Sequence, residues 1–80
     1  MMEIDVRLFA SAREIAGTNA TRIMLTEPAT VKDLETALFE RHPGLEALRL
    51  RIAINARYAP AGAQVHPDDE VAVIPPVGGG

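Results

Sequence analysis

The last residues of the sequence hold a group whose chemistry stands out. Residues 74–80 read Ile-Pro-Pro-Val-Gly-Gly-Gly. Two successive prolines cannot donate to a sheet and favour an extended polyproline conformation, so we expect a strand to end at Ile74 and a stiff, narrow segment to follow. From Pro75 to Gly80 the extended chain would reach roughly 20 Å. Such a segment could enter a site in another protein where any Cβ would clash, and its distinctive functional group is the α-carboxylate of Gly80.

A carboxylate resists substitution at neutral pH, so this group would need activation. Attack on the α-phosphate of ATP would give an acyl-adenylate with a good leaving group. A sulfur donor could then convert the acyl carbon to a thiocarboxylate, whose sulfur is a better nucleophile than the original oxygen. A frayed, glycine-rich chain end is the alternative interpretation. The Pro75-Pro76 pair directly after a strand, and the end of the sequence at Gly80, favour a reactive tail.

Other kinds of catalytic site find little support. The absence of cysteine excludes disulfides, thiolate metal sites and a cysteine nucleophile. His42 and His66 each precede a proline and have no histidine or cysteine at ligand spacing, so we expect solvated histidines and no metal site. Residues 68–70, Asp-Asp-Glu, are typical of a solvated turn. Glycines 78–80 precede no helix and do not form a phosphate loop. We therefore expect no catalytic side chains and no bound cofactor.

Length and charge limit the classes of protein and partner. With 80 residues the chain forms one small domain, to whose stability a partner could add. A net charge of −3, with no basic run and few aromatic residues, argues against nucleic acid as a partner. The acidic start Met-Met-Glu-Ile-Asp does not resemble a signal peptide, and no apolar stretch approaches the roughly 20 residues of a membrane span. We expect a cytoplasmic protein without membrane contact.

Periodicity places two strands and a short helix before the main helix. Residues 3–9 alternate, with Ile4, Val6 and Leu8 on one face, which predicts a half-buried strand. Residues 10–16 predict a helical turn that Gly17 can end, and residues 21–26 predict a second strand, antiparallel to the first. We expect Phe9, between the first strand and this turn, to serve packing and not recognition.

The main helix is expected to begin at Thr30. Thr30 and Asp33 resemble a capping box, and residues 31, 34 and 38 place Val, Leu and Leu on one face. Pro43 should end this helix.

Further strands are predicted at 50–55, with residues 50, 52 and 54 inward, and at 71–74, with a tight reversal at 55–58 and a short return at Val65. In the last strand Val71 and Val73 should face the helix, and Ile74 should point away from it. The element order indicates an α+β fold with one main helix on one face of a sheet.

Three segments resemble the small subunit of molybdopterin synthase, the MoaD-like branch of the ubiquitin-like sulfur carriers. Residues 6–17, Val-Arg-Leu-Phe-Ala-Ser-Ala-Arg-Glu-Ile-Ala-Gly, are similar to the opening strand and turn of that family. Ile54-Asn55 stands at a strand end before a reversal. Residues 69–80 resemble the ending Asp-Glu-Val…Pro-Pro-Val-x-Gly-Gly, with Gly78 where the family often has alanine or threonine. The resemblance spans nearly the whole chain.

The resemblance implies a β-grasp (ubiquitin-like) fold over residues 1–74, with a mixed sheet whose last strand is central and parallel to the first, and an extended tail over 75–80. It implies that an E1-like adenylating enzyme uses ATP to activate Gly80, that a sulfur donor protein supplies the thiocarboxylate, and that the tail inserts into the large synthase subunit within a heterotetramer. Two sulfur transfers would then build the dithiolene of molybdopterin from cyclic pyranopterin monophosphate.

Around the tail we expect a surface that binds the partner, with Gly79 entering the partner's active site. Its members are Tyr58, Ile74, Pro75, Pro76, Val77 and Gly78. Arg13 and Glu14 match the turn motif of the family and are expected to form an exposed ion pair or to brace the turn.

Three alternatives stay open: a sulfur carrier for thiazole, cysteine or tRNA thiolation, a ubiquitin-like modifier that forms isopeptide bonds with lysines, and a binding module with an inert tail.

Overall fold

The computed structural model describes residues 1–75 and contains seven strands, two α-helices and a 3-10 helix in that part of the chain. In chain order they are β1 (Met2–Leu8), α1 (Ala10–Ala16), β2 (Ala20–Leu25), β3 (Ala29–Thr30), α2 (Val31–Arg41), η1 (Pro43–Ala47), β4 (Arg51–Ile54), β5 (Arg57–Tyr58), β6 (Gln64–Val65) and β7 (Val71–Ile74).

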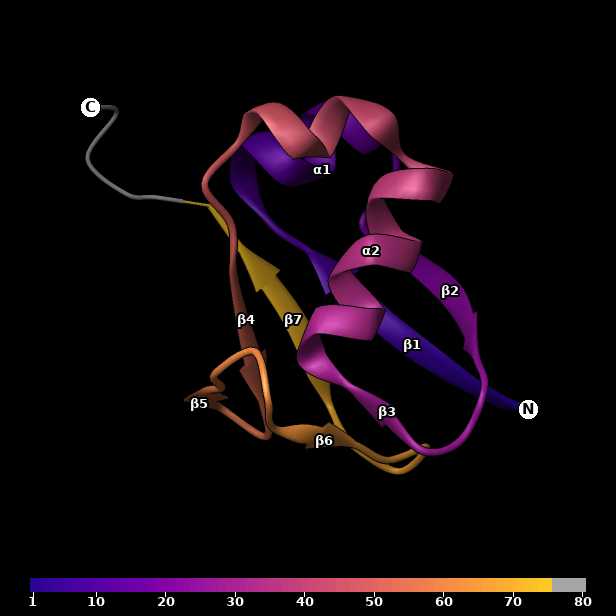
Figure 1. Cartoon of the computed structure of the whole chain (residues 1–80). Coiled ribbons are helices and arrows are strands. Elements are labelled where there is room, and N and C mark those ends of the chain that lie inside the picture. The colour runs from indigo at the N-terminus through magenta and orange to yellow at the C-terminus, as the bar shows by residue number, and fades with distance from the viewer. Residues whose placement is uncertain (76–80) are drawn as a thin grey trace.

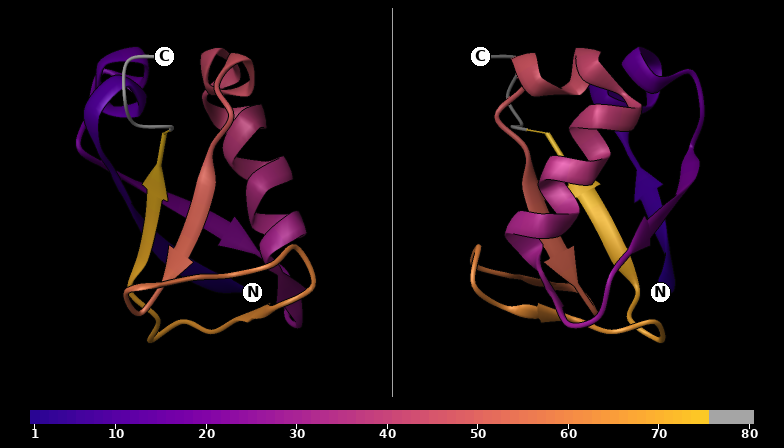
Figure 2. Two further views of the ribbon diagram at one scale, coloured as in Figure 1. Left: turned by 90° about the vertical axis from the view of Figure 1, so that its left-hand side faces the viewer. Right: turned by 45° about the vertical axis from the view of Figure 1, so that its right-hand side comes forward.

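Five of the strands form one mixed sheet in the order β2-β1-β7-β4-β5. β7 lies in the middle, parallel to β1 and antiparallel to β4, while β1 and β2 are antiparallel. Helix α2 crosses one face of this sheet, as Figures 1 and 2 show. This is the β-grasp arrangement, and it confirms the predicted α+β class and the central, parallel last strand.

The core lies between α2 and the sheet. Leu34 and Leu38 of α2 are fully buried, one and two turns along the face that the spacing predicted. They meet the inward side chains of the strands, which alternate with exposed ones as a half-buried sheet requires. The strand members of this core are Ile4, Val6, Leu8, Ile23, Leu25, Ile52, Val71 and Val73.

Local signals fixed the helix ends as predicted. The Thr30 hydroxyl accepts a hydrogen bond from the Asp33 amide at 3.3 Å, and the Asp33 carboxylate accepts one from the Thr30 amide at 2.9 Å, which completes the capping box. Gly17 ends α1 with a left-handed φ of 76°. Helix α2 ends at Arg41, two residues before Pro43.

Two predictions about the strands were wrong in detail. The short strand β3 was not foreseen, because two residues carry no periodicity and its pairing with β6, Ala29 opposite Val65, is a tertiary contact. Leu50 lies before β4 and is half-buried, so the strand covers residues 51–54 and not 50–55. Ala53 lies on the outer side of the sheet as predicted, opposite Ala72, although only 5 % of it is exposed.

No helix within residues 1–75 is long and apolar enough to cross a membrane.

Candidate functional site: the open face of the sheet and the end of β7

The face of the sheet opposite α2 carries no helix over its central strands (Figure 2). Its members follow from the strand register, since residues directly opposite one another share a face. Ala53 lies opposite both Tyr58 and Ala72, and Ala72 lies opposite Arg7. We call this surface the open face. Its residues are Glu3, Asp5, Arg7, Ala20, Arg22, Met24, Arg51, Ala53, Tyr58, Ala72 and Ile74.

A shallow hollow lies at the centre of the open face. Its floor is made by Ala53 and Ala72, because two alanines side by side on adjacent strands leave room that larger side chains would fill. Phe9, Tyr58 and Ile74 also line it. Charged side chains complete the lining, so the hollow combines an apolar floor with a polar rim, as partner sites in many proteins do. They are Asp5, Arg7, Asp68, Asp69 and Glu70.

Phe9 corrects a prediction. We expected it to serve packing, but its side chain is 47 % exposed and lines the hollow. The reason is local geometry: Phe9 is the extended N-cap of α1, and Ala10 follows it with a left-handed φ of 52°. Phe9 therefore continues the extended conformation of β1, in which residues 2, 4, 6 and 8 are buried and residues 3, 5 and 7 are exposed, and this alternation places Phe9 on the open face.

Strand β7 carries the chain to the tail. Val71 and Val73 are 2 % and 0 % exposed and anchor the strand on the core side, while Ile74 is half-buried on the open face, as predicted. Pro75 is buried. α1 and η1 lie at the end of the sheet where β7 stops (Figures 1 and 2). The other predicted site residues, Pro76, Val77, Gly78, Gly79 and Gly80, lie outside the described residues.

The start of β7 is fixed by Asn55, in the turn between β4 and β5. The Asn55 side chain accepts a hydrogen bond from the Glu70 amide at 2.9 Å and donates one to the Asp69 carboxylate at 3.1 Å. Its own amide donates to the Glu70 carbonyl at 2.8 Å. Asp69 in turn accepts from the His66 amide at 2.8 Å, so its carboxylate organises the loop and is not merely solvated as expected. This network holds the β4–β5 turn against the residues that enter the central strand.

Tyr58 is exposed and stacked by a cation. Its side chain is 56 % exposed, and the Arg51 guanidinium carbon lies 3.8 Å from the ring centroid. Arg51 also lies directly opposite Ile74 in the sheet register. The predicted pair Tyr58 and Ile74 is therefore brought onto one surface, with Arg51 between the strands that carry them.

The prediction that His42 is a solvated side chain was wrong. Its Nε2 lies 3.1 Å from the Thr21 hydroxyl, which also accepts a hydrogen bond from Nε of Arg41 at 3.2 Å. Burial, and secondarily the charge of Arg41, lower the pKa of His42 below its ordinary value. These contacts tie the end of α2 to β2 on the core side, away from the open face.

The remaining polar residues that the sequence singled out lie apart from this surface or make no ion pair there. Arg13 and Glu14 are both exposed on α1 and do not pair with each other. The ion pairs found among residues 1–75 join Arg22 to Glu3 and to Asp5, all exposed on the open face. Within the same residues no group of three or more histidine, aspartate or glutamate side chains could hold a metal ion.

The sequence did not single out Arg51, and it underrated Phe9 and Asn55 as parts of this region. The contacts of Arg51 and Asn55 arise only in the folded chain, whereas the alternation of β1 already places Phe9 on the exposed face. Arg51 alternates with buried Ile52 in an ordinary strand pattern, and its stacking on Tyr58 depends on the hairpin that returns β5 beside β4.

Comparison with known proteins agrees with this fold. The sequence profile of the ThiS family matches residues 6–80. The molybdopterin synthase sulfur carrier subunit of Homo sapiens is 34 % identical, over 100 % of this chain and 97 % of that protein. The protein of the same description from Chlamydomonas reinhardtii is 37 % identical, over 99 % of this chain and 100 % of its own length. The crystal structure of small archaeal modifier protein 1 from Haloferax volcanii superimposes with a TM-score of 0.86 at 32 % identity, over 98 % of this chain and 99 % of that chain.

A profile that matches nearly the whole length, together with full-length relatives above 30 % identity, confirms the resemblance that the terminal motifs indicated, and the chain belongs to the ThiS family of ubiquitin-like sulfur carriers.

Proposed function

We propose that this chain is the sulfur-carrier small subunit of a molybdopterin synthase. The observation that carries the proposal is the full-length identity of 34–37 % to proteins described as the sulfur carrier subunit of that synthase. The fold supports it, because the tail follows directly after β7, the central strand, whose Val71 and Val73 are buried in the core.

The chemistry takes place at the carboxylate of Gly80 and uses no side chain of this protein. An activating enzyme joins that carboxylate to the α-phosphate of ATP, and pyrophosphate leaves. The persulfide of a sulfur donor protein then forms a carbon–sulfur bond at the acyl carbon as AMP leaves. A thiol reductant cleaves the sulfur–sulfur bond of the resulting acyl disulfide, which releases the donor and gives the thiocarboxylate. In the large subunit this sulfur attacks a side-chain carbon of cyclic pyranopterin monophosphate and displaces the oxygen substituent bound there, which joins Gly80 to the pterin as a thioester. Hydrolysis of the resulting thioester restores the Gly80 carboxylate and leaves the sulfur on the pterin, and two rounds build the dithiolene.

The domain itself supplies the surface that binds the large subunit. Tyr58 and Ile74 border the hollow over Ala53 and Ala72, and the buried Pro75 follows Ile74 directly. Beyond it, Pro76, Val77 and Gly78 continue the contact, and Gly79 passes through the narrow entrance of the partner's active site. A partner that fills the hollow is thereby placed at the base of the tail.

The test is reconstitution of the synthase from pure components. The thiocarboxylated chain, mixed with the large subunit and cyclic pyranopterin monophosphate, should yield molybdopterin in proportion to the thiocarboxylate supplied. A chain lacking Gly80, and a chain with residues added after Gly80, should give none, since neither presents a thiocarboxylate at that position. If the thiocarboxylated chain binds the large subunit but yields no molybdopterin, the synthase role is wrong.

A protein-modifying role is the second candidate. It is favoured by the likeness to small archaeal modifier protein 1, which is 33 % identical over 96 % of this chain. In that role the activated Gly80 carbonyl would form an isopeptide bond with a lysine amine as AMP leaves. Lysates should then contain higher-mass conjugates that disappear when Gly80 is deleted. Lys32 is the only lysine of this chain, so conjugates of the chain with itself can form only there or at its amino terminus.

A further inference from the structure

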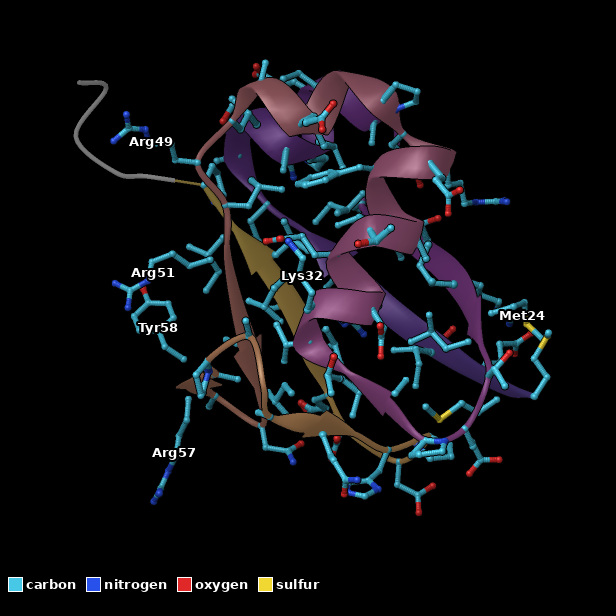
Figure 3. The ribbon with its side chains drawn as sticks, in the orientation of Figure 1. Met24, Lys32, Arg49, Arg51, Arg57 and Tyr58 are labelled. Carbon is cyan, nitrogen blue, oxygen red and sulfur yellow. The ribbon has the colours of Figure 1, made fainter. Side chains whose placement is uncertain are left out.

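A strongly charged edge of the domain has no role in the scheme above. Residues 49–57 hold Arg49, Arg51 and Arg57, whereas all 11 acidic residues of the chain lie outside this stretch. Figure 3 shows these three arginines with Tyr58 along one side of the molecule, beside β4 and β5 and far from Met24 on the opposite edge. We call them the arginine edge. It is a positive strip on a protein whose net charge is −3.

The arginine edge is not neutralised within the domain. Among residues 1–75, none of Arg49, Arg51 and Arg57 lies within ion-pair distance of a carboxylate, whereas Arg22 on the far strand has two such partners. All three arginines are exposed. Their charges therefore remain available to an acidic group from outside the domain.

Arg51 is held in a defined orientation. Its guanidinium stacks on the Tyr58 ring at 3.8 Å from the centroid, and a stacked guanidinium keeps its in-plane N–H groups free for a carboxylate. Less side-chain freedom is then lost when a partner binds, and arginine and tyrosine are the residue types most enriched among those that dominate binding energy at protein interfaces.

The arginine edge is continuous with the base of the tail. Arg51 lies directly opposite Ile74, the last residue of β7, and Arg51 belongs to the part of β4 that β5 does not pair, since β5 reaches only residues 53 and 54. A protein that received the tail would therefore have surface beside these arginines.

Building on the proposed function, we propose that the arginine edge is an electrostatic docking site for the large synthase subunit, which presents a row of carboxylates beside the entrance for the tail. Exposed pairs of this kind add little stability each but raise the rate of encounter and fix orientation. The edge would align the domain before the tail enters the partner, and the partner would then fill the hollow over Ala53 and Ala72.

The test compares two variants that lose equal charge. One carries Arg49→Gln, Arg51→Gln and Arg57→Gln. The control carries Arg13→Gln, Lys32→Gln and Arg41→Gln, three exposed cations on α1 and α2 that lie outside the open face. Association with the purified large subunit is followed by stopped-flow or surface plasmon resonance at 50 and 200 mM salt, a range over which screening weakens such attraction. Circular dichroism and size-exclusion chromatography establish that both variants fold and stay monodisperse.

We expect the edge variant to associate roughly 10- to 100-fold more slowly than wild type at low salt and to lose most of its salt dependence, while the control stays within about 3-fold. Arg51→Lys keeps the charge but not the planar fork, and should fall between wild type and the edge variant. Equal association rates for the edge variant and the control would overturn the proposal. It would also be overturned if the edge variant bound the large subunit as wild type does but aggregated, because the arginines would then serve only to prevent association through a sheet edge.

Two further readouts separate this proposal from the proposed function and from another class of partner. The thiocarboxylated edge variant is also assayed at a concentration that saturates the large subunit. If it then yields wild-type amounts of molybdopterin, the arginines act in docking and not in sulfur transfer. If wild type makes no molybdopterin yet shows the arginine-dependent binding, the synthase role fails and the docking site stands. Tight, arginine-dependent binding of a labelled RNA duplex, without arginine-dependent binding of the large subunit, would overturn the protein docking site.

Discussion

Replacement of Asn55 by alanine tests the part of the structure that fixes the start of β7. The change removes two side-chain hydrogen bonds, from the Glu70 amide at 2.9 Å and to the Asp69 carboxylate at 3.1 Å. Each contributes about 1 kcal/mol net. Asn55 also has a left-handed φ of 52°, which asparagine adopts more readily than alanine by a further few tenths of a kcal/mol. We expect Asn55→Ala to lower the free energy of unfolding by about 2–3 kcal/mol.

The assay is urea unfolding followed by far-ultraviolet circular dichroism, with the thermal midpoint as a second readout. A loss of this size should lower the midpoint by roughly 10–20 °C in a domain of this length. Asn55→Gly is the matched control, because glycine accepts the left-handed φ and loses only the hydrogen bonds. A change below about 0.5 kcal/mol for Asn55→Ala would refute the reasoning, since it would mean that the network adds nothing to the exposed turn.

Three smaller predictions concern stability alone. Ala56→Gly should raise the free energy of unfolding by about 0.5–1 kcal/mol, because Ala56 has a strained φ of 70° that glycine adopts freely; urea unfolding measures it, and a loss of stability would contradict it. Thr30→Ala should cost about 1 kcal/mol by opening the capping box, with helix content near wild type at 25 °C. Because the pKa of His42 is lowered in the fold, protonation of His42 favours the unfolded chain. The stability that neutral His42 contributes to the fold is complete above about pH 6.5 and declines as the pH falls below that value. The difference in stability between wild type and His42→Gln should therefore shift in favour of the variant between pH 7.5 and 5.5, and a pH-independent difference would contradict the assignment.

Docking on the hollow has its own test. Ala72→Trp places a large ring over the floor that Ala72 shares with Ala53 on the half-exposed side of β7. Binding of the large subunit should weaken at least 10-fold in isothermal titration calorimetry, while the free energy of unfolding changes by less than about 1.5 kcal/mol. The control is Ala20→Trp, on the same face but at the far strand β2. Equal effects of the two variants would show that the partner does not use the hollow.

Local rules accounted for most of the scaffold. The alternation in β1 and β7, the 31–34–38 spacing in α2, the Thr30–Asp33 box and the left-handed Gly17 each predicted a feature that the structure confirms. Each of these features depends on residues that are close together in the sequence, so the local sequence pattern is sufficient to predict it. The central place of β7 came from the family resemblance, because pairing between the first and last strands has no local signature.

The features that escaped prediction share a different cause, which is contact between distant residues. His42 is withdrawn from solvent by Thr21, which lies 21 positions earlier in the chain. Phe9 is the exception, because the local alternation of β1 already places it on the exposed face, where its side chain is found. Arg51 acquires its role from Tyr58, across a hairpin. In the candidate site the sequence predicted Tyr58 and Ile74 on one surface, while the hollow between them follows from the register that puts Ala53 beside Ala72.

The central claim is that Gly80 carries a thiocarboxylate, and the most direct measurement is an intact-mass spectrum of untagged protein isolated from its own cells. The account predicts a species heavier than the unmodified chain by the difference between a sulfur and an oxygen atom, with fragmentation placing that difference at Gly80. If only the unmodified carboxylate is found, even after incubation with ATP, a sulfur donor and the activating enzyme of the same cells, the sulfur-carrier account is contradicted.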